Sequence, residues 1–132
     1  MLVVDASVLL VALSNRPSAP LVRRRLEQDD EQAAPEIIDV EVFGVIRGHF
    51  LRGHVDRSGA ELAIDRLHDW AGERFTHRPF LSRAWALRHN VRGWDAFYVA
   101  LAEALGATLL TTDGRLARAE GPHCSIEILP AD

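Results

Sequence analysis

Short apolar runs alternate along the chain with longer segments of helical periodicity, and this alternation limits the possible folds more than any other feature. The runs Leu2–Val4 and Thr108–Thr112 are short and rich in apolar or β-branched residues, which is typical of buried strands. Over 36–52 and 94–105, apolar residues instead recur every three or four positions, which predicts amphipathic helices. Strands that alternate with helices predict an α/β fold in which a parallel central sheet is sandwiched by helices.

The remaining segments fit the same alternation. Ser7 is expected to cap a helix over 8–13, because a serine side chain at such a position accepts a hydrogen bond from the first turn. The segment Ala33–Pro35 is interpreted as the lead-in to the long helix over 36–52. Further elements are expected as helices over 21–27, 58–70, 81–89 and 115–119, and as strands over 75–78 and 125–129. Since no repeat or linker interrupts the pattern, residues 1–132 are expected to form a single domain.

Composition excludes several classes of protein. The hydrophobic share of 48% and the charged share of 26% are those of an ordinary globular domain. One cysteine and no lysine exclude an internal disulfide, a cysteine-based zinc cluster, a P-loop and Schiff-base chemistry. The longest apolar run, 96–102, is too short to span a membrane, and no secretory signal is recognisable. We therefore expect a cytoplasmic protein without a membrane partner.

Acidic residues follow two of the expected strands and lie on two of the expected helices. Asp5 and Asp113 come directly after the two β-branched runs. In open α/β sheets ligands bind beyond the carboxyl ends of the strands, so these two acids are expected to converge. Glu41 lies in the long helix and Asp95 at the start of a later one, and both helices should pack on the sheet. Each acid alone fits a turn or a helix terminus, but together they indicate a site.

Four motifs carry these acids in the order found in PIN-domain nucleases. The motifs are Val4–Val8 around Asp5, Ala34–Val42 around Glu41, Trp94–Ala102 around Asp95 and Thr111–Ala119 around Asp113. Each motif alone is weakly specific, but four in order are a strong signal. The resemblance runs the full length of the chain, and the spacing of the motifs is close to that of the VapC toxins.

The resemblance implies a PIN-like fold and a Mg²⁺-dependent endoribonuclease, with Mn²⁺ as the alternative metal. It also implies the toxin role in a type II toxin–antitoxin pair, with an RNA substrate, a cognate antitoxin and a homodimer. Asp5, Glu41, Asp95 and Asp113 are then the catalytic and metal-binding residues, with Asp5 and Asp95 nearest the metal. This chemistry suits carboxylates, because Mg²⁺ and Mn²⁺ prefer oxygen ligands and activate water for attack on phosphorus.

Hydroxyl groups and histidines adjoin these motifs. Ser7 and Thr112 are expected to orient a carboxylate or a bound water from outside the ligand set. Thr111 alternates away from Thr112 on the expected strand, so we interpret it as structural. The histidines, including His49 and His54, lack the i, i+4 pairing of a zinc-binding helix and are interpreted as incidental.

Aromatic and basic residues around Asp95 are candidates for RNA binding. Trp94 and Tyr98 offer rings on which bases could stack, whereas Phe97 is expected to pack against the sheet. Arg88 and Arg92 share a helical spacing and either contact phosphates or form a solvated face. All fifteen basic residues are arginine, which forks onto phosphate oxygens, although a net charge of −4 is unusual for a nucleic-acid-binding protein.

Other interpretations compete with this one. A receiver-like signalling domain would carry paired acids near the first strand and a lysine near the last, and the chain has neither. A haloacid-dehalogenase-type phosphatase would need a second acid where Ser7 stands. A catalytically silent PIN-fold binding module is disfavoured by the presence of all four acids. Among nucleases, a DNA-flap or rRNA-processing role stays open, although such relatives usually carry extra segments.

Overall fold

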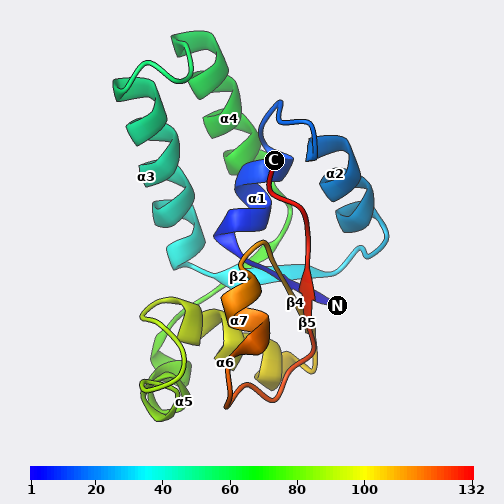
Figure 1. Ribbon diagram of the computed structural model, residues 1–132, viewed down its shortest axis with the longest axis vertical. Helices are drawn as coiled ribbons and strands as arrows, with labels where there is room; N and C mark the ends of the chain where they lie inside the picture. Colours follow the sequence, from blue (N-terminus) through cyan, green and yellow to red (C-terminus); the bar gives the residue numbers. More distant parts are fainter.

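The computed structural model describes residues 1–132 and places five parallel strands in one sheet between two groups of helices (Figure 1). The strands are β1 (Leu2–Val4), β2 (Gln32–Pro35), β3 (Glu73–Phe75), β4 (Thr108–Thr111) and β5 (Ile126–Ile128). The helices are α1 (Ala6–Ala12), α2 (Ala19–Glu27), α3 (Ile37–Leu51), α4 (Arg57–Asp69), the 3₁₀ turn η1 (Arg78–Phe80), α5 (Leu81–Ala86), α6 (Asp95–Leu105) and α7 (Gly114–Arg118). The predicted α/β fold with a sandwiched parallel sheet is confirmed.

β1 is the central strand of the sheet, whose strand order is β3-β2-β1-β4-β5. The chain first adds β2 and β3 on one side of β1, and later adds β4 and β5 on the other. The register pairs Val3 with Ala33 of β2 and with Leu109 of β4. Strand order therefore reverses between β1 and β4, and this switch point is where an open α/β sheet forms its ligand crevice.

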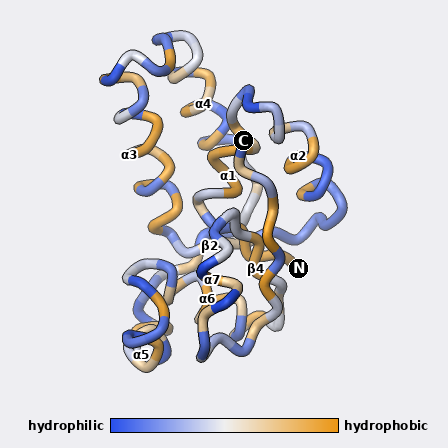
Figure 2. The backbone as a smooth tube through the Cα atoms, viewed as in Figure 1, coloured by the Kyte–Doolittle hydropathy of each residue, from blue (hydrophilic) through white to orange (hydrophobic).

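Helices cover both faces of the sheet. Helices α1 to α4 lie on one side of it, and α5 and α6 lie on the other (Figure 1). Because both faces are covered, β1 and β4 read as continuous apolar runs, and Val3, Val4, Leu109 and Leu110 are fully buried. In Figure 2 the hydrophobic colour recurs along the strands and the inward parts of the helices, while the outer loops are mostly hydrophilic. No helix is long and apolar enough to cross a membrane.

Gly106 ends α6 and turns the chain into β4. Its φ of 62° lies in the left-handed region, which glycine adopts without a steric penalty. The N–H of Ala107 then donates to the carbonyl of Ala102 at 2.9 Å, which closes the end of the helix. This tight reversal lets β4 return beside β1, and so brings Asp113 to the end of the sheet where Asp5 lies.

The strand β2 was not expected from the sequence. Alanine and proline have low strand propensity, and Ala33–Pro35 was interpreted as a lead-in to the following helix. In the structure Ala33 and Ala34 are buried between the helical layers, and α3 and α6 both pack on β2. Small side chains suit this position because they let helices approach the strand from both faces, so packing overrides propensity here.

Two boundaries also differ from the sequence-based expectation. The strand expected over 75–78 lies earlier, at Glu73–Phe75, because Pro79 falls in the following 3₁₀ turn and lacks the N–H that a strand ladder uses. The helix expected from Ser58 begins at Arg57, because Asp56 is its N-cap and accepts a hydrogen bond from the N–H of Gly59 at 2.7 Å.

Candidate active site

The four predicted acids lie around the switch point of the sheet. Asp5 follows β1 and is the N-cap of α1, and Asp113 follows β4 and is the N-cap of α7. The N–H of Asp5 donates to the carbonyl of Leu110 at 3.0 Å, which ties the ends of β1 and β4 together. Glu41 comes from α3, and Asp95 is the first residue of α6. Helices from opposite faces of the sheet therefore bring their acids to one place.

Asp5 is the most buried of the four, with 7% of its surface exposed. Its Oδ2 accepts hydrogen bonds from the hydroxyls of Ser7 at 2.7 Å and Thr111 at 2.8 Å. Burial raises the pKa of Asp5, although these hydroxyls and the N–H of Ala6 act in the opposite direction. The two hydroxyls hold one carboxylate oxygen, which leaves Oδ1 as the oxygen that can meet a ligand.

The hydroxyl that holds Asp5 from β4 belongs to Thr111, and not to Thr112 as the sequence suggested. Thr111 is fully buried, and its hydroxyl also accepts from the N–H of Asp113 at 3.1 Å. Thr112 contributes its backbone N–H to Ser7 Oγ at 3.1 Å, and its own hydroxyl contacts no carboxylate. Thr111 and Thr112 do point in different directions, as strand alternation predicts, but alternation alone does not say which of the two points toward Asp5.

Ser7 also differs in part from its predicted role. It was expected to cap α1, but the helix begins at Ala6 with Asp5 as its N-cap, so Ser7 lies inside the first turn. Its hydroxyl donates to Asp5 and accepts from Thr112, as a group that orients a carboxylate should. The expectation that Ser7 contacts an acid is confirmed, and the capping role is wrong.

Glu41 accepts a hydrogen bond from a tyrosine that the sequence did not assign to the site. The hydroxyl of Tyr98 donates to Glu41 Oε1 at 2.9 Å, and Tyr98 is fully buried. Burial, together with the negative charges of Asp5 and Asp95, raises the pKa of Glu41 to about 7, against the lowering effect of the tyrosine. Burial also raises the pKa of Tyr98, which keeps its proton and stays a donor.

The sequence suggests Tyr98 as a ring for base stacking, but its burial makes that interpretation wrong. A signal for its real place was present in the sequence. Tyr98 follows Asp95 by three positions on the same helix, and residues three apart share a helix face. A buried tyrosine also needs a partner for its hydroxyl, so an acid lining the same cleft was a natural candidate.

Asp95 and Asp113 have opposite electrostatic environments. Burial, with the charges of Asp5 and Asp113, raises the pKa of Asp95 to about 6, although Arg92 and Arg115 oppose the change. The pKa of Asp113 is instead lowered, because the Arg115 side chain forks onto its two oxygens at 3.1 and 3.2 Å and the Arg115 N–H donates to Oδ1. Asp113 thus stays ionised while Asp95 resists ionisation.

The donor set fits a hard divalent cation. Every candidate ligand is a carboxylate, the group that Mg²⁺ and Mn²⁺ prefer, and three of the four have a raised pKa in a half-buried or buried position. A cation would relieve the repulsion that contributes to these shifts. No three acidic, histidine or cysteine side chains form a ready-made metal cage, so water would have to complete the coordination, as Mg²⁺ commonly allows.

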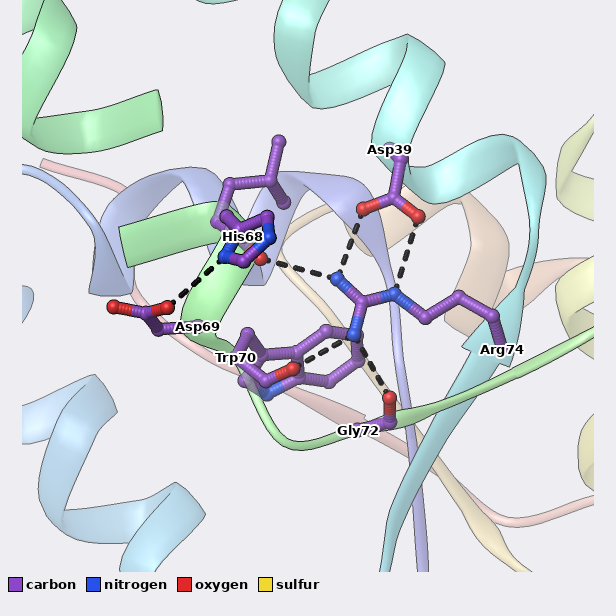
Figure 3. Close-up of polar contacts among 7 residues, drawn as sticks. Asp39, His68, Asp69, Trp70, Gly72 and Arg74 are labelled. Carbon is purple, nitrogen blue, oxygen red and sulfur yellow. Dashed lines mark hydrogen bonds and ion pairs between the residues drawn. The ribbon is translucent and has the colours of Figure 1, made fainter. Parts of the chain in front are cut away.

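Arg74 and its partners, shown in Figure 3, hold the start of α3, the helix that carries Glu41. Arg74 forks onto the carboxylate of Asp39 at 2.9 and 3.1 Å, and it donates to the carbonyls of Leu67, Trp70 and Gly72. Its guanidinium also lies 4.8 Å from the ring of Trp70. Because Asp39 is two residues before Glu41, these contacts hold the first turns of α3 against β3 and the end of α4.

A histidine supports the same helix start. The N–H of Ile37 donates to Nε2 of His77 at 3.1 Å, and the His77 ring packs edge-on against Phe97 with centroids 5.5 Å apart. His77 is thus a structural residue, whereas the sequence indicates only incidental histidines. The two main cavities lie elsewhere: one of about 360 Å³ between α1, α3 and α4, and one of about 540 Å³ along α3 and α4. Neither cavity includes any of the four acids.

Several known proteins are similar to this chain in sequence. The family model described as the PIN domain matches residues 2–122. Ribonuclease VapC1 of Mycobacterium tuberculosis is 38% identical over 128 residues, which are 96% of each chain. Ribonuclease VapC12 of the same organism is 38% identical over 130 residues, or 98% of this chain and 99% of the relative. VapC ribonuclease Mb0985 of Mycobacterium bovis is 36% identical over 133 residues, with coverage of 98% and 99%.

A solved structure agrees with the fold. The crystal structure of VapBC2 from Rickettsia felis, bound to a DNA fragment from their promoter, aligns with a TM-score of 0.69 at 14% sequence identity. It covers 97% of this chain and 98% of that chain. The receiver-like and phosphatase interpretations are therefore wrong. The chain belongs to the PIN-domain family and, within it, to the VapC ribonucleases.

Proposed function

We propose that this ribonuclease is the toxin of a type II toxin–antitoxin pair in the cytoplasm, and that it cleaves RNA with Mg²⁺ or Mn²⁺ held by Asp5, Glu41, Asp95 and Asp113. The main support is the convergence of these carboxylates at the switch point, where three of them have raised pKa values. The names of the relatives at 36–38% identity add support for ribonuclease activity.

The chain's own groups would divide the work around a bound cation. When bound, the cation would offset phosphate charge and lower the pKa of water in the site. Asp5, held by Ser7 and Thr111, would present its free oxygen in a fixed direction. Glu41 has a pKa of about 7 in the metal-free protein, so its free oxygen can take up or release a proton near neutral pH. Tyr98 would hold the other oxygen of Glu41 in place.

Purified protein tests the metal-dependent activity directly. We expect cleavage of RNA with Mg²⁺ or Mn²⁺ and none in EDTA. Asp95→Asn keeps the shape of the side chain and removes its charge, so cleavage should slow by about 10²-fold or more while the protein stays folded. A matched control is Asp65→Asn, an exposed acid on α4. Cleavage that persists in chelator, or a normal rate for Asp95→Asn, would contradict this assignment.

The cognate antitoxin is proposed as the partner that silences the site. Converging carboxylates are costly without a cation, and an arginine can fork onto two carboxylate oxygens at once. We propose that a basic residue of the antitoxin, an arginine, reaches these acids and competes with metal or RNA. Co-expression with the gene upstream should yield a stable complex that does not cleave RNA. A complex that forms and still cleaves at the normal rate would refute the blocking mechanism.

A homodimer is also proposed, through the apolar surface of α3. Val40, Phe43 and Phe50 are exposed apolar side chains on this long helix. Large exposed apolar patches commonly mark protein interfaces. Light scattering of the isolated protein should give the mass of a dimer, and Phe43→Ser should shift it toward the monomer. A wild-type protein that is monomeric at high micromolar concentration would exclude this interface.

A further inference from the structure

Two exposed tryptophans lie in the segment that leads from α5 to Asp95. Trp85 on α5 is 68% exposed, and Trp94, directly before Asp95, is 61% exposed. Large aromatic side chains usually bury most of their surface, so an indole left in solvent is informative. Tyr98 and Phe97 of the following helix do not share this property, since one is buried and the other half-buried.

The segment between the two tryptophans is anchored rather than loose. Ala84, Leu87 and Val91 are buried at i, i+3 and i+7 spacing. Helical hydrogen bonds continue beyond the end of α5, because the N–H of Arg88 donates to the carbonyl of Trp85 and that of Val91 to the carbonyl of Leu87. The opposite face is therefore held in a fixed position toward solvent.

That opposite face carries Trp85, Arg88 and Arg92, which repeat the i, i+3 and i+7 spacing. All three side chains are exposed. The Arg88 guanidinium lies 4.5 Å from the ring of Trp85. Neither arginine forms an ion pair with a carboxylate, so both charges are available to an outside anion. α5 ends at Ala86 and the chain continues in hydrogen-bonded turns as far as Val91, so the three side chains lie on one short stretch of the chain.

This surface adjoins the acids. Arg92 is close enough to Asp95 and Asp113 for its charge to lower the pKa of both carboxyl groups. Trp94 is bonded directly to Asp95 in the chain. A phosphodiester held at the acids would consequently have its neighbouring nucleotides within reach of Arg92 and Trp94.

We propose that Trp85, Arg88, Arg92 and Trp94 form a stacking platform that binds single-stranded RNA and delivers it to the carboxylate site. Indole rings stack on the faces of bases that are not paired, and arginines contact the adjoining phosphates. The four side chains combine the two features that recognition of single strands requires, exposed aromatic faces and unpaired positive charge, on a protein whose net charge is −4. The platform rests on the proposed RNA substrate, and it adds selectivity for unpaired nucleotides.

Binding measured without cleavage tests the platform. In EDTA, the full-length protein is titrated against a short fluorescein-labelled RNA, either single-stranded or annealed to its complement, and anisotropy is recorded. We expect the single strand to bind more tightly than the duplex. Trp94→Ala and Trp85→Ala should each weaken binding of the single strand about 10-fold, and Trp94→Phe, which keeps an aromatic face, should stay within about threefold of wild type. Arg92→Ala should reduce the slope of log K against log salt by about 0.7.

Matched controls lie outside the platform. Leu62→Ala removes an exposed apolar side chain from α4, and Arg24→Ala removes an exposed arginine from α2. Both should bind RNA as wild type does. Equal binding of single strand and duplex, or tryptophan variants that bind as well as Leu62→Ala, would overturn the proposal. The same holds if Trp94→Ala and Trp85→Ala keep RNA affinity but lose self-association or antitoxin binding, because the surface would then serve a protein.

The platform and the metal-dependent activity can fail separately. If the tryptophan variants lose single-strand binding but wild type cuts no RNA with Mg²⁺ or Mn²⁺, the platform stands and the proposed activity falls. If wild type cuts RNA and the tryptophan variants cut it with unchanged KM, the activity stands and the platform falls. Thermal melting and the recovery of binding in Trp94→Phe separate loss of stacking from a disturbed start of α6.

Discussion

Thr111→Val removes one buried hydroxyl while it nearly preserves the shape of the side chain. In the structure that hydroxyl donates to Asp5 Oδ2 at 2.8 Å and accepts from the N–H of Asp113 at 3.1 Å. Thr111 is fully buried, so water has no access to replace either bond. The substitution leaves Asp5 with the hydroxyl of Ser7 as its remaining side-chain donor.

The magnitude follows from these two bonds. Loss of a hydrogen bond to a charged carboxylate costs about 1.5–3 kcal/mol, and an amide left without a partner costs about 1 kcal/mol. The added methyl group of valine offsets about 1 kcal/mol through burial. We expect the free energy of unfolding to fall by about 1.5–3 kcal/mol at pH 8. The loss should be smaller at pH 5, because the hydroxyl of Thr111 favours the ionised form of Asp5.

Urea denaturation in EDTA at the two pH values measures both quantities. Thr112→Val is the matched control, since the hydroxyl of Thr112 contacts no carboxylate and only its backbone N–H is used. The control should unfold within about 0.5 kcal/mol of wild type. Equal losses in the two variants, or a Thr111→Val loss under 0.5 kcal/mol at both pH values, would refute the claim that Thr111 holds Asp5.

Three further results are expected. The folded-state pKa of Glu41 is about 7 against an ordinary value of 4.5, so the free energy of unfolding of the metal-free protein should fall as pH rises from 4.5 through 7. Glu41→Gln should flatten this decline in urea titrations. An unchanged dependence of the unfolding free energy on pH in Glu41→Gln would contradict it. Tyr98→Phe removes the hydroxyl that favours ionised Glu41, so the acidic limb of the pH–rate profile should move to higher pH, and a shift to lower pH would be inconsistent with this. Arg74→Ala removes the partner of Asp39 and the donor to three backbone carbonyls, so it should destabilise the fold by about 2 kcal/mol. Arg57→Ala, at an exposed pair on α4, should leave the urea midpoint unchanged. Similar midpoints for both variants would rule out the anchoring role of Arg74.

Sequence patterns predicted the sheet and its acids because both follow from local rules. A buried parallel strand reads as an apolar run, so β1 and β4 were recognisable, and the acids after them had to lie at the carboxyl ends of the strands. The strand β2 escaped because Ala33 and Ala34 are selected by the space between two helical layers, and that space is a property of the assembled fold. A residue chosen for its small volume leaves no strand pattern in the sequence.

The support around the acids was predictable only in part. Ser7 lies two residues from Asp5, so its contact with that carboxylate follows from local chain geometry. Thr111 and Tyr98 reach their acids from elements that are distant in sequence, and their roles depend on which face of the strand or helix meets the crevice. The ion pair of Asp39 and Arg74 joins α3 to β3, and the two residues are 35 positions apart in the sequence. No local periodicity indicates such a contact.

The four acids have different neighbours, and this difference separates the pKa values of their carboxyl groups. The Arg115 side chain binds both carboxylate oxygens of Asp113, which stays charged. Asp95 has only more distant positive charges, and its pKa is about 6. Glu41, with one tyrosine donor and two acidic neighbours, has a pKa of about 7. In the metal-free protein Glu41 therefore loses its proton at a higher pH than Asp95 does, and a cation that binds Glu41 must compete with that proton near neutral pH. Binding of a cation at Glu41 is thus coupled to the release of a proton in the neutral range.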